Sequence, residues 1–453
     1  MARVVIVGAG ISGLSLAWYL HRLRPNWELL LVEAEERCGG KALTHREEGF
    51  IVERGVNGFL DNKPSTLELA RELGLELYPS LETARRRFVV KGGRLLELPS
   101  SPKAFLASPL LRWGEKLRLL MEPFIPKAPA HLEESLAQFA RRRLGEGALR
   151  WLIDPMATGI YAGDPERLSL RACFPRIHEL EQEYGSLIRA MVALGRKARR
   201  EGKEGPGAGP GGTLTSFREG MGEMISALAS HFRSCIRLST PAEAVVPAPG
   251  GWEVALAGGE QVRCSHVVLA IPAHRCARLT EESLPELAEL ARRVEYPPVA
   301  VVALGVKKGR GVPPLDGFGF LAPSAAGRRI LGVLWDSSIF PNRAPQGYHL
   351  VRVLVGGARD RETPRLPDPD LLDLVLRELR ELMGLEAAPD YTSIHRWPRA
   401  IPQYHLGHLE LQARVEGILR EQKGLHIRCN WLGGVSFNDC IANSMALARE
   451  MAP

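Results

Sequence analysis

Three glycines near the start of the chain have the types and spacing of a nucleotide site. Gly8, Gly10 and Gly13 follow a short run of β-branched residues and open a segment with the spacing of a buried helix face. Such glycines allow a tight turn, close approach of the backbone to a pyrophosphate and close helix–strand packing, and the helix N-terminus attracts the anion. A second apolar strand ends in Glu33, 20 residues after Gly13, where a carboxylate can accept hydrogen bonds from a ribose. The pattern predicts a dinucleotide-binding βαβ unit; the alternative is a tight turn that simply needs small residues.

A second glycine turn indicates which dinucleotide binds. From Glu33 the chain continues Ala34-Glu35-Glu36-Arg37-Cys38-Gly39-Gly40-Lys41-Ala42-Leu43-Thr44. This run resembles the Glu-Ala-x-x-Arg-x-Gly-Gly-(Arg/Lys)-x-x-Thr signature of the FAD-dependent amine oxidase superfamily, which nicotinamide-binding folds lack. The second turn would give backbone access to the diphosphate and the flavin, with Lys41 as a positive charge. The resemblance therefore implies FAD.

A third glycine turn precedes the last predicted helix. Gly433 and Gly434 stand just before it, so backbone N–H groups at the helix start could face the flavin carbonyl or the pyrophosphate. The superfamily resemblance also implies that the loop 55–58 passes near the flavin ring, where the alternative is a hairpin turn, and Ala242 near the adenosine. Trp397 matches a position near the flavin in a narrower family that the chain also resembles. The predicted FAD contacts are Gly8, Ala9, Gly10, Ile11, Ser12, Gly13, Glu33, Ala34, Lys41, Gly55, Val56, Asn57, Gly58, Ala242, Trp397, Val435, Ser436 and Phe437.

The composition is that of a globular protein of two or three domains. The chain has 453 residues, 45% hydrophobic and 25% charged, with a net charge of +7. No helix-turn-helix, zinc-finger or RNA-binding pattern accompanies the positive charge, so nucleic acid is not expected as a partner. Seven cysteines without a Cys-x-x-Cys pair argue against a disulfide framework and against a metal site. No apolar run approaches roughly 18 residues, and the first strand leaves no room for a signal peptide, so we expect a cytoplasmic protein.

The order of predicted strands and helices indicates an α/β fold. We predict a Rossmann-like FAD-binding domain (residues 1–77, 214–277 and 393–453), a mixed α+β substrate domain (78–95 and 278–392) and a helical, membrane-associating domain (96–213). The substrate domain should contain an antiparallel sheet with a helix at 368–384 packed on it. Residues 102–125 combine an apolar, aromatic face with Lys and Arg, which suits an anionic membrane surface or, equally, a core helix with a solvated charged face.

Several further runs narrow the resemblance to one family. The chain resembles the protoporphyrinogen and coproporphyrinogen oxidases over essentially its whole length and in order. The runs that carry the resemblance are Gly-Ile-Tyr-Ala-Gly-Asp at 159–164, Leu-Ser at 168–169, Cys-Phe-Pro at 173–175, Ser-Leu-Ile at 186–188, Gly-Phe-Gly-Phe-Leu at 317–321, Ile-Pro-Gln-Tyr-His-Leu-Gly-His at 401–408 and Asn-Asp-Cys-Ile at 438–441. Lys41, where Arg or Trp is commoner, and Cys429, where a glycine usually precedes Asn, depart slightly from the family pattern.

The family resemblance implies where the substrate binds. Arg87 matches an arginine that pairs with a propionate of the tetrapyrrole, a role that suits the two parallel hydrogen bonds of a guanidinium. The pattern alone equally allows a solvated arginine within a triplet. The other implied substrate contacts are Phe318, Gly319, Leu321, Leu334 and Leu354, with Gly319 allowing close approach of the ring. For the apolar positions, the alternative is plain core.

The implied reaction is the oxidation of protoporphyrinogen IX to protoporphyrin IX, with six electrons removed, O2 as acceptor and peroxide released. No Ser/His/Asp or Cys/His constellation stands out, and we assign no catalytic side chain, because the cofactor carries the chemistry. Coproporphyrinogen III is the alternative substrate. A FAD amine oxidase, a carotenoid desaturase and a flavin-binding scaffold without turnover are the other hypotheses. Peripheral association with the cytoplasmic membrane and a homodimer are further hypotheses.

Overall fold

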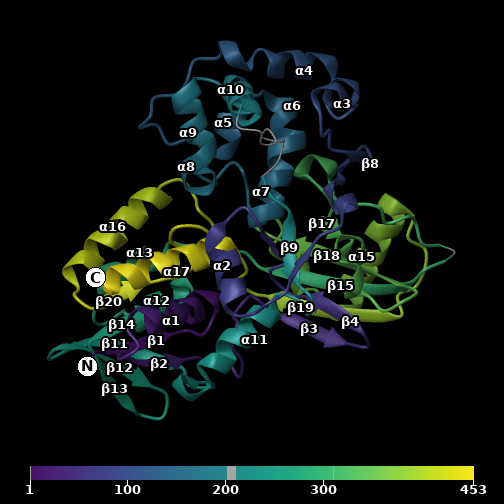
Figure 1. Cartoon of the computed structure of the whole chain (residues 1–453). Coiled ribbons are helices and arrows are strands. Elements are labelled where there is room, and N and C mark those ends of the chain that lie inside the picture. The colour runs from purple at the N-terminus through teal and green to yellow at the C-terminus, as the bar shows by residue number, and fades with distance from the viewer. Residues whose placement is uncertain (1, 201–210, 310, 453) are drawn as a thin grey trace.

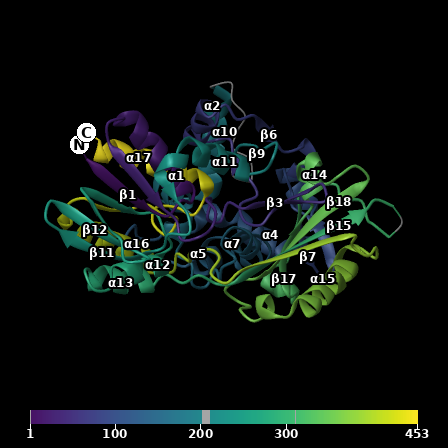
Figure 2. The same cartoon turned by 90° about the horizontal axis from the view of Figure 1, so that it is seen from below.

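The computed structural model describes residues 2–200, 211–309 and 311–452. Two halves built on separate sheets lie side by side, and a group of helices covers their junction from one side (Figure 1). Both ends of the chain lie in the half that contains the first strand (Figures 1 and 2). Residues 201–210, which belong to the predicted helical domain, lie outside the described part of the chain.

The first half is a five-stranded parallel sheet between two layers. Its strand order is β10-β2-β1-β14-β20. Val4 and Ile6 point to one face, and Val5 and Val7 to the other, and all four are buried. This explains the continuous apolar run of β1, since both faces of a parallel sheet are covered. The strands are β1 (Arg3–Val7), β2 (Glu28–Val32), β10 (Ile236–Arg237), β14 (His266–Leu269) and β20 (Leu425–Ile427).

Different elements cover the two faces of this sheet. One face packs against α1 (Ile11–Leu23), α2 (Pro64–Glu72), α11 (Gly222–His231) and α17 (Phe437–Met451). The other packs against the sheet of β11 (Ala242–Ala248), β12 (Gly251–Leu256) and β13 (Gln261–Cys264), and against α12 (Ala273–Leu279), α13 (Pro285–Arg292) and α16 (His408–Glu421). The first and last helices are therefore neighbours in space.

The second half is a seven-stranded sheet with one helix-covered face. Its order is β19-β15-β18-β17-β16-β7-β8, and every pairing is antiparallel except β16 with β7. The predicted helix is confirmed as α15 (Asp368–Met383), which packs on one face. The strands are β7 (Arg87–Lys91), β8 (Arg94–Glu97), β15 (Val299–Lys307), β16 (Gly319–Leu321), β17 (Ile330–Leu334), β18 (Tyr348–Gly356) and β19 (Tyr391–Trp397).

Short strands join the two halves. The hairpin of β3 (Thr44–Glu47) and β4 (Phe50–Glu53) follows the second glycine turn, and a small sheet has the order β5-β9-β6. Its strands are β5 (Phe59–Leu60), β6 (Leu77–Pro79) and β9 (Leu214–Phe217). These elements bring residues 44–60 between the two large sheets.

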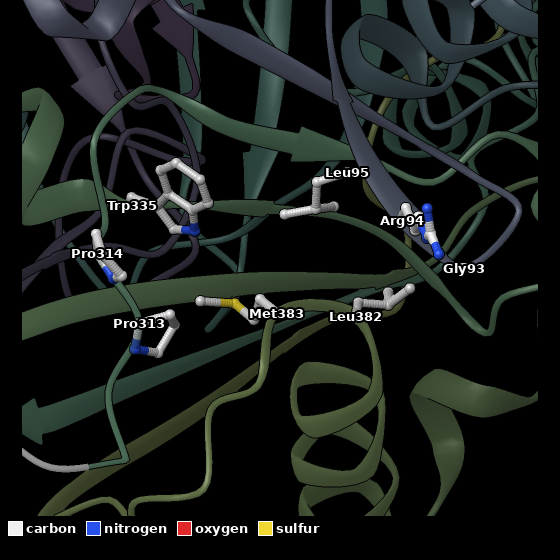
Figure 3. A pocket seen from close by; sticks show the side chains of 8 residues that line it. All are labelled: Gly93, Arg94, Leu95, Pro313, Pro314, Trp335, Leu382 and Met383. Carbon is white, nitrogen blue, oxygen red and sulfur yellow. The ribbon is translucent and has the colours of Figure 1, made fainter. Parts of the chain in front are cut away.

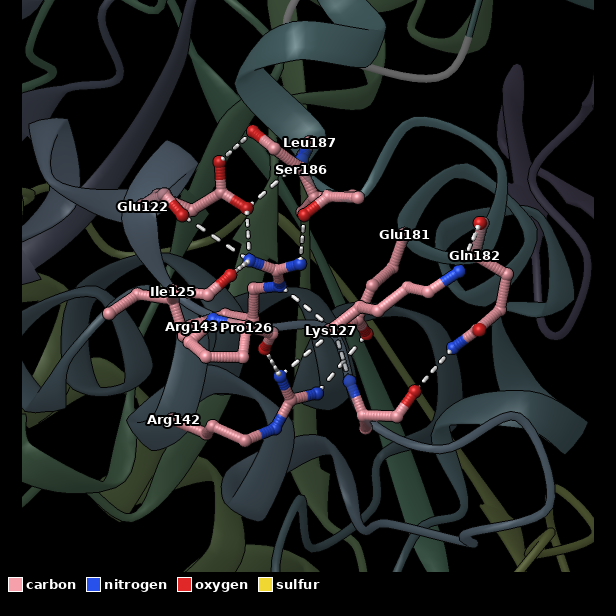
Figure 4. Close-up of polar contacts among 12 residues, drawn as sticks. Glu122, Ile125, Pro126, Lys127, Arg142, Arg143, Glu181, Gln182, Ser186 and Leu187 are labelled. Carbon is pink, nitrogen blue, oxygen red and sulfur yellow. Dashed lines mark hydrogen bonds and ion pairs between the residues drawn. The ribbon is translucent and has the colours of Figure 1, made fainter.

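The helical group is tied together by buried ion pairs. Arg143 and Glu181 are both fully buried and lie 2.9 Å apart, and Arg143 also pairs with buried Glu122 at 3.1 Å (Figure 4).

The predicted amphipathic segment 102–125 is not one helix: it breaks at Pro109, which disfavours helical geometry in the residue before it. The helices are α3 (Pro102–Ala107), α4 (Trp113–Leu120), α5 (Leu136–Arg143), α6 (Glu146–Ala148), α7 (Asp154–Tyr161), α8 (Leu170–Cys173), α9 (Pro175–Tyr184) and α10 (Leu187–Arg200).

Candidate active site

The first glycine turn has one position that packing leaves open. A Cβ atom added to Gly13 would collide with the carbonyl oxygen of Gly8, so Gly13 is required by the packing of α1 on β1. Gly8 has φ +104°, and its added Cβ would lie 2.6 Å from the carbonyl oxygen of Ala270. Gly10 differs, because an added Cβ would meet nothing within 4 Å. The space over Gly10 therefore fits a ligand that approaches the backbone closely.

The start of α1 offers unpaired backbone donors at the same place. Gly10 is the N-cap residue, and no side chain caps the helix. The first intrahelical bond is donated by Leu14 to the carbonyl of Gly10. The N–H groups of Ile11, Ser12 and Gly13 therefore have no acceptor within the helix, and the helix dipole adds partial positive charge. This arrangement suits the diphosphate of a dinucleotide.

Glu33 closes the turn at the end of β2. Its Oε2 accepts the N–H of Ala9 at 2.8 Å, and its Oε1 accepts the N–H of Glu35 at 3.1 Å. The side chain is half-buried, and each carboxylate oxygen can accept more than one hydrogen bond. Glu33 therefore orients the glycine turn and keeps acceptor capacity for a ribose hydroxyl. Ala34 follows it and is exposed.

Lys41 is engaged by the protein itself. Its ammonium donates to the carbonyl oxygens of Arg399 and Ala400 and lies 5.2 Å from the ring centre of Tyr296. Burial lowers its pKa to about 8. The structure thus shows Lys41 linking the second glycine turn to the segment after Trp397.

The loop at residues 55–58 contacts both halves of the protein. An added Cβ at Gly55 would collide with the carbonyl of Lys41, and one at Gly58 would lie 2.7 Å from the carbonyl oxygen of Thr215. Val56, partly buried, packs on the core around α1. Asn57 Oδ1 accepts from Arg352 Nη2 at 2.5 Å.

A network of buried polar groups behind Asn57 was not among the predicted features. Arg352 is 1% exposed and binds both carboxylate oxygens of Asp336, at 2.8 and 2.9 Å. Its guanidinium also donates to the carbonyl oxygen of Glu53. Because Asn57 gives its oxygen to Arg352, its amide nitrogen points elsewhere, and that nitrogen is buried without a partner among the described residues. Asn57 thus presents a free donor.

The C-terminal turn packs against the N-terminal one. Ser436 caps α17, with its hydroxyl accepting from the N–H of Asp439 at 3.1 Å. Ser444 on α17 donates to the carbonyl oxygen of Ser12 on α1 at 2.9 Å. The structure therefore packs α17 against the start of α1, and Phe437 at the start of α17 lies in the same hydrophobic cluster as Ala9.

Trp397 and Ala242 mark two further predicted positions. Trp397 Nε1 donates to the carbonyl oxygen of Arg54 at 2.6 Å, which places the indole beside the loop 55–58. Ala242 begins β11, and the N–H of nearby Thr240 donates to the carbonyl oxygen of Glu33 at 2.8 Å. Ala242 therefore lies close in sequence to a direct contact with Glu33.

The predicted apolar contacts share one face of the seven-stranded sheet. Directly paired residues point to the same face, and Leu354 pairs with Gly332, which pairs with Leu321. Leu334 lies two residues from Gly332 and so points the same way. Leu321, Leu334 and Leu354 are half-buried, whereas the intervening side chains are buried under α15. The face opposite α15 therefore carries an apolar wall of these three half-buried leucines, beside buried Arg352, which pairs with Leu334.

Arg87 stands at one end of this wall. It pairs across the sheet with Gly319, and its guanidinium lies 4.8 Å from the ring centre of Phe318. The neighbouring Arg85 and Arg86 form ion pairs with carboxylates, but among the described residues Arg87 forms none. Arg87 is thus the member of the triplet that is free to bind an anionic group.

Strand pairing explains why position 319 is a glycine, which the sequence alone did not indicate. Its φ is +125°, and an added Cβ would collide with the carbonyl oxygen of Val333 on the paired strand. The pairing of β16 with β17 therefore requires glycine here, with or without a ligand.

A cavity on the opposite side of the same sheet is separate from these residues. It has about 340 Å³ and is lined by the β7–β8 hairpin, Trp335 and the end of α15 (Figure 3). None of the predicted contacts lines it. The predicted substrate contacts on the sheet therefore lie on the face opposite α15, away from this cavity.

Comparison with known proteins identifies the family of the chain. The family described as flavin containing amine oxidoreductase matches residues 11–446, and the chain belongs to this family. It is thus a flavin oxidoreductase with a mixed α/β fold, and its cofactor is FAD.

Named relatives cover nearly the whole chain. Coproporphyrinogen III oxidase of Bacillus subtilis is 30% identical over 99% of this chain and 97% of its own. Protoporphyrinogen oxidase 1 of Arabidopsis thaliana chloroplasts is 32% identical, covering 99% and 87%. A crystal structure from Exiguobacterium sp. 255-15, provisionally named a protoporphyrinogen oxidase, has 27% identity and a TM-score of 0.85, covering 100% of this chain and 98% of that one.

Proposed function

We propose that this flavoenzyme oxidises a porphyrinogen to the porphyrin, with protoporphyrinogen IX as the substrate and O2 as the electron acceptor. The observation that carries the proposal is the wall formed by Leu321, Leu334 and Leu354, with unpaired Arg87 at its end. An apolar macrocycle that bears carboxylates needs both features. The names of the relatives support the same substrate class.

The protein itself binds the macrocycle, orients it and excludes water from it. FAD supplies the two-electron acceptor when it is bound, and a porphyrinogen needs three such oxidations. The wall and Phe318 would hold the macrocycle by apolar contact, and Arg87 would fix its orientation through a propionate. Water exclusion from such an apolar face favours transfer without side reactions.

We propose that all the predicted cofactor positions contact FAD. The starts of α1 and α17 would hold the diphosphate and flavin oxygens, Glu33 the ribose, and the loop 55–58 with Trp397 the flavin region. The domain division stated above, with residues 96–213 as the helical domain, is part of this proposal, as is the homodimer.

Coproporphyrinogen III is the second candidate, because relatives of similar identity carry that name. Porphyrin fluorescence, followed with each porphyrinogen under air, separates the two. The proposal predicts faster turnover of protoporphyrinogen IX. Fluorescence from coproporphyrinogen III alone would overturn the choice of substrate.

Arg87→Ala should weaken substrate binding more than the chemical step. Loss of a charge-assisted pair costs about 1.5–3 kcal/mol, so KM should rise about 10- to 100-fold with a small change in kcat. Arg85→Ala is the matched control, since Arg85 is exposed and pairs with Glu82 at 3.1 Å. Steady-state kinetics of both variants measure the effect. An unchanged KM in Arg87→Ala would remove the propionate role.

We also propose that the helical group binds an anionic membrane surface. No helix among the described residues is long and apolar enough to cross a membrane. However, Trp113 is 73% and Phe124 79% exposed, with Leu117 and Leu120 exposed beside them. Exposed aromatic side chains on one surface favour interfacial binding.

The Trp113→Ser/Phe124→Ser variant should lose co-sedimentation with vesicles that contain anionic lipid. Leu238→Ser, an exposed leucine in the cofactor half, is the control and should co-sediment like the wild type. If the wild type stays in the supernatant at low salt, the protein does not bind this surface.

A further inference from the structure

Tyr404 lies between the C-terminal glycine turn and the helical group. Its side chain is 2% exposed, and its ring stacks on His408 with centroids 4.0 Å apart. The hydroxyl donates to the carbonyl oxygen of Asn430 at 2.7 Å and accepts from the N–H of Gly434 at 3.0 Å. One phenol thus ties together two points of the turn that leads into α17.

The turn depends on such an external restraint. Gly433 and Gly434 have φ of +78° and +123°. Glycine loses more conformational freedom on ordering than any other residue, so two in succession leave the turn poorly determined by its own sequence. Asn443 adds one more bond, from its side-chain amide to the carbonyl oxygen of Gly433 at 2.8 Å. Tyr404 supplies the contact at Gly434, next to the residues predicted to face FAD.

The other side of Tyr404 belongs to the helical group. Its backbone carbonyl accepts the N–H of Ser169 at 2.8 Å. Its ring lies in the hydrophobic cluster of Tyr161 and Leu168, and Val435 packs against that cluster. Burial raises the pKa of the Tyr404 phenol, so it stays a donor to Asn430. The turn is therefore anchored on a rigid base outside the cofactor half.

We propose that Tyr404 is a positioning residue for FAD. Its hydroxyl holds the turn before α17 in the conformation that directs the backbone N–H group of Val435 to the cofactor, while the N–H of Ser436 donates to Asp439 Oδ2 at 3.3 Å. The inference rests on the proposed role of this turn in FAD binding.

Tyr404→Phe keeps the ring and its packing and removes only the two hydrogen bonds. Each such bond contributes about 1 kcal/mol, so the dissociation constant of FAD should rise about tenfold or more. Tyr161→Phe is the matched control: Tyr161 lies in the same cluster, but its hydroxyl donates to the carbonyl oxygen of Cys173 at 3.2 Å and does not touch the turn. Titration of each FAD-free protein with FAD, followed by flavin fluorescence, gives the constants.

The expected result is weaker FAD binding in Tyr404→Phe and wild-type binding in Tyr161→Phe. Equal affinity in Tyr404→Phe and the wild type, or an equal loss in both variants, would overturn the inference. A wild-type protein that binds no FAD would instead contradict the proposed function.

Amide hydrogen exchange of the FAD-free wild type provides a test that needs no variant. The Gly434 amide should be protected, and in Tyr404→Phe exchange should quicken at residues 431–436 while the rest of the chain is unchanged. Exchange of the Gly434 amide at the rate of an open chain in the wild type would show that the phenol does not hold the turn.

Discussion

Gly10→Ala is expected to weaken FAD binding while the FAD-free protein stays folded. The backbone at Gly10 has φ −74°, which alanine adopts without strain, and the added methyl group would meet no protein atom within 4 Å. It would instead occupy the space that a pyrophosphate needs for close approach. Overpacking of this kind costs about 1–3 kcal/mol, so the affinity should fall about 5- to 150-fold.

Gly13→Ala provides the contrast within the same motif. Its methyl group would collide with the carbonyl oxygen of Gly8, so this variant should lose stability in the FAD-free protein as well. Thermal unfolding and FAD titration of both variants separate the two effects. If Gly10→Ala binds FAD like the wild type, the diphosphate does not lie over Gly10.

Arg352→Met should destabilise the FAD-free protein by about 3–5 kcal/mol, because it leaves a buried carboxylate without its partner. The Asp336 side chain is 3% exposed, and Arg352 binds both of its oxygens. Arg352 also holds Asn57, so the loop 55–58 should lose order together with the fold. Equilibrium unfolding in urea measures the change in the free energy of unfolding.

Arg86→Ala is the control for that experiment. Arg86 pairs with Glu97 at 3.0 Å and also with Asp316, but its side chain is 44% exposed, and exposed pairs contribute only about 0–1 kcal/mol. A loss in Arg352→Met as small as that in Arg86→Ala would show that the Arg352–Asp336 pair does not anchor the loop.

The cofactor half could be predicted because its signals are local. The glycines of the first turn, the alternating burial of Val4 to Val7 and the position of Glu33 all lie within one βαβ unit. The contacts of Glu33 with Ala9 and Glu35 are made inside the same unit. Periodicity and spacing are sufficient for such features.

The supporting network could not be predicted because its members are far apart in the sequence. Arg352 binds Asn57, which lies 295 positions away in the sequence. Within β18, Arg352 is a charged residue in an otherwise mostly apolar strand. The hydrogen bond between Tyr404 and the N–H of Gly434 could not be predicted for the same reason, because no local sequence pattern indicates that these two groups meet. A charged residue inside an otherwise apolar strand is the one signal that could have drawn attention to Arg352.

For two predicted residues, packing in the structure shows a role other than the predicted one. Gly319 was expected to let the ring approach, but the collision with Val333 shows that strand pairing alone requires it. Lys41 was expected to offer a free charge, but its ammonium is bound by the carbonyls of Arg399 and Ala400. Both outcomes depend on a partner strand or turn that the local sequence does not specify.

The most direct test of the proposed function is to mix the FAD-loaded protein with protoporphyrinogen IX without oxygen and follow the flavin absorbance. The proposal predicts rapid bleaching of the oxidised flavin band, and its recovery when air is admitted. A flavin band that stays unchanged with both protoporphyrinogen IX and coproporphyrinogen III would contradict porphyrinogen oxidation by this protein.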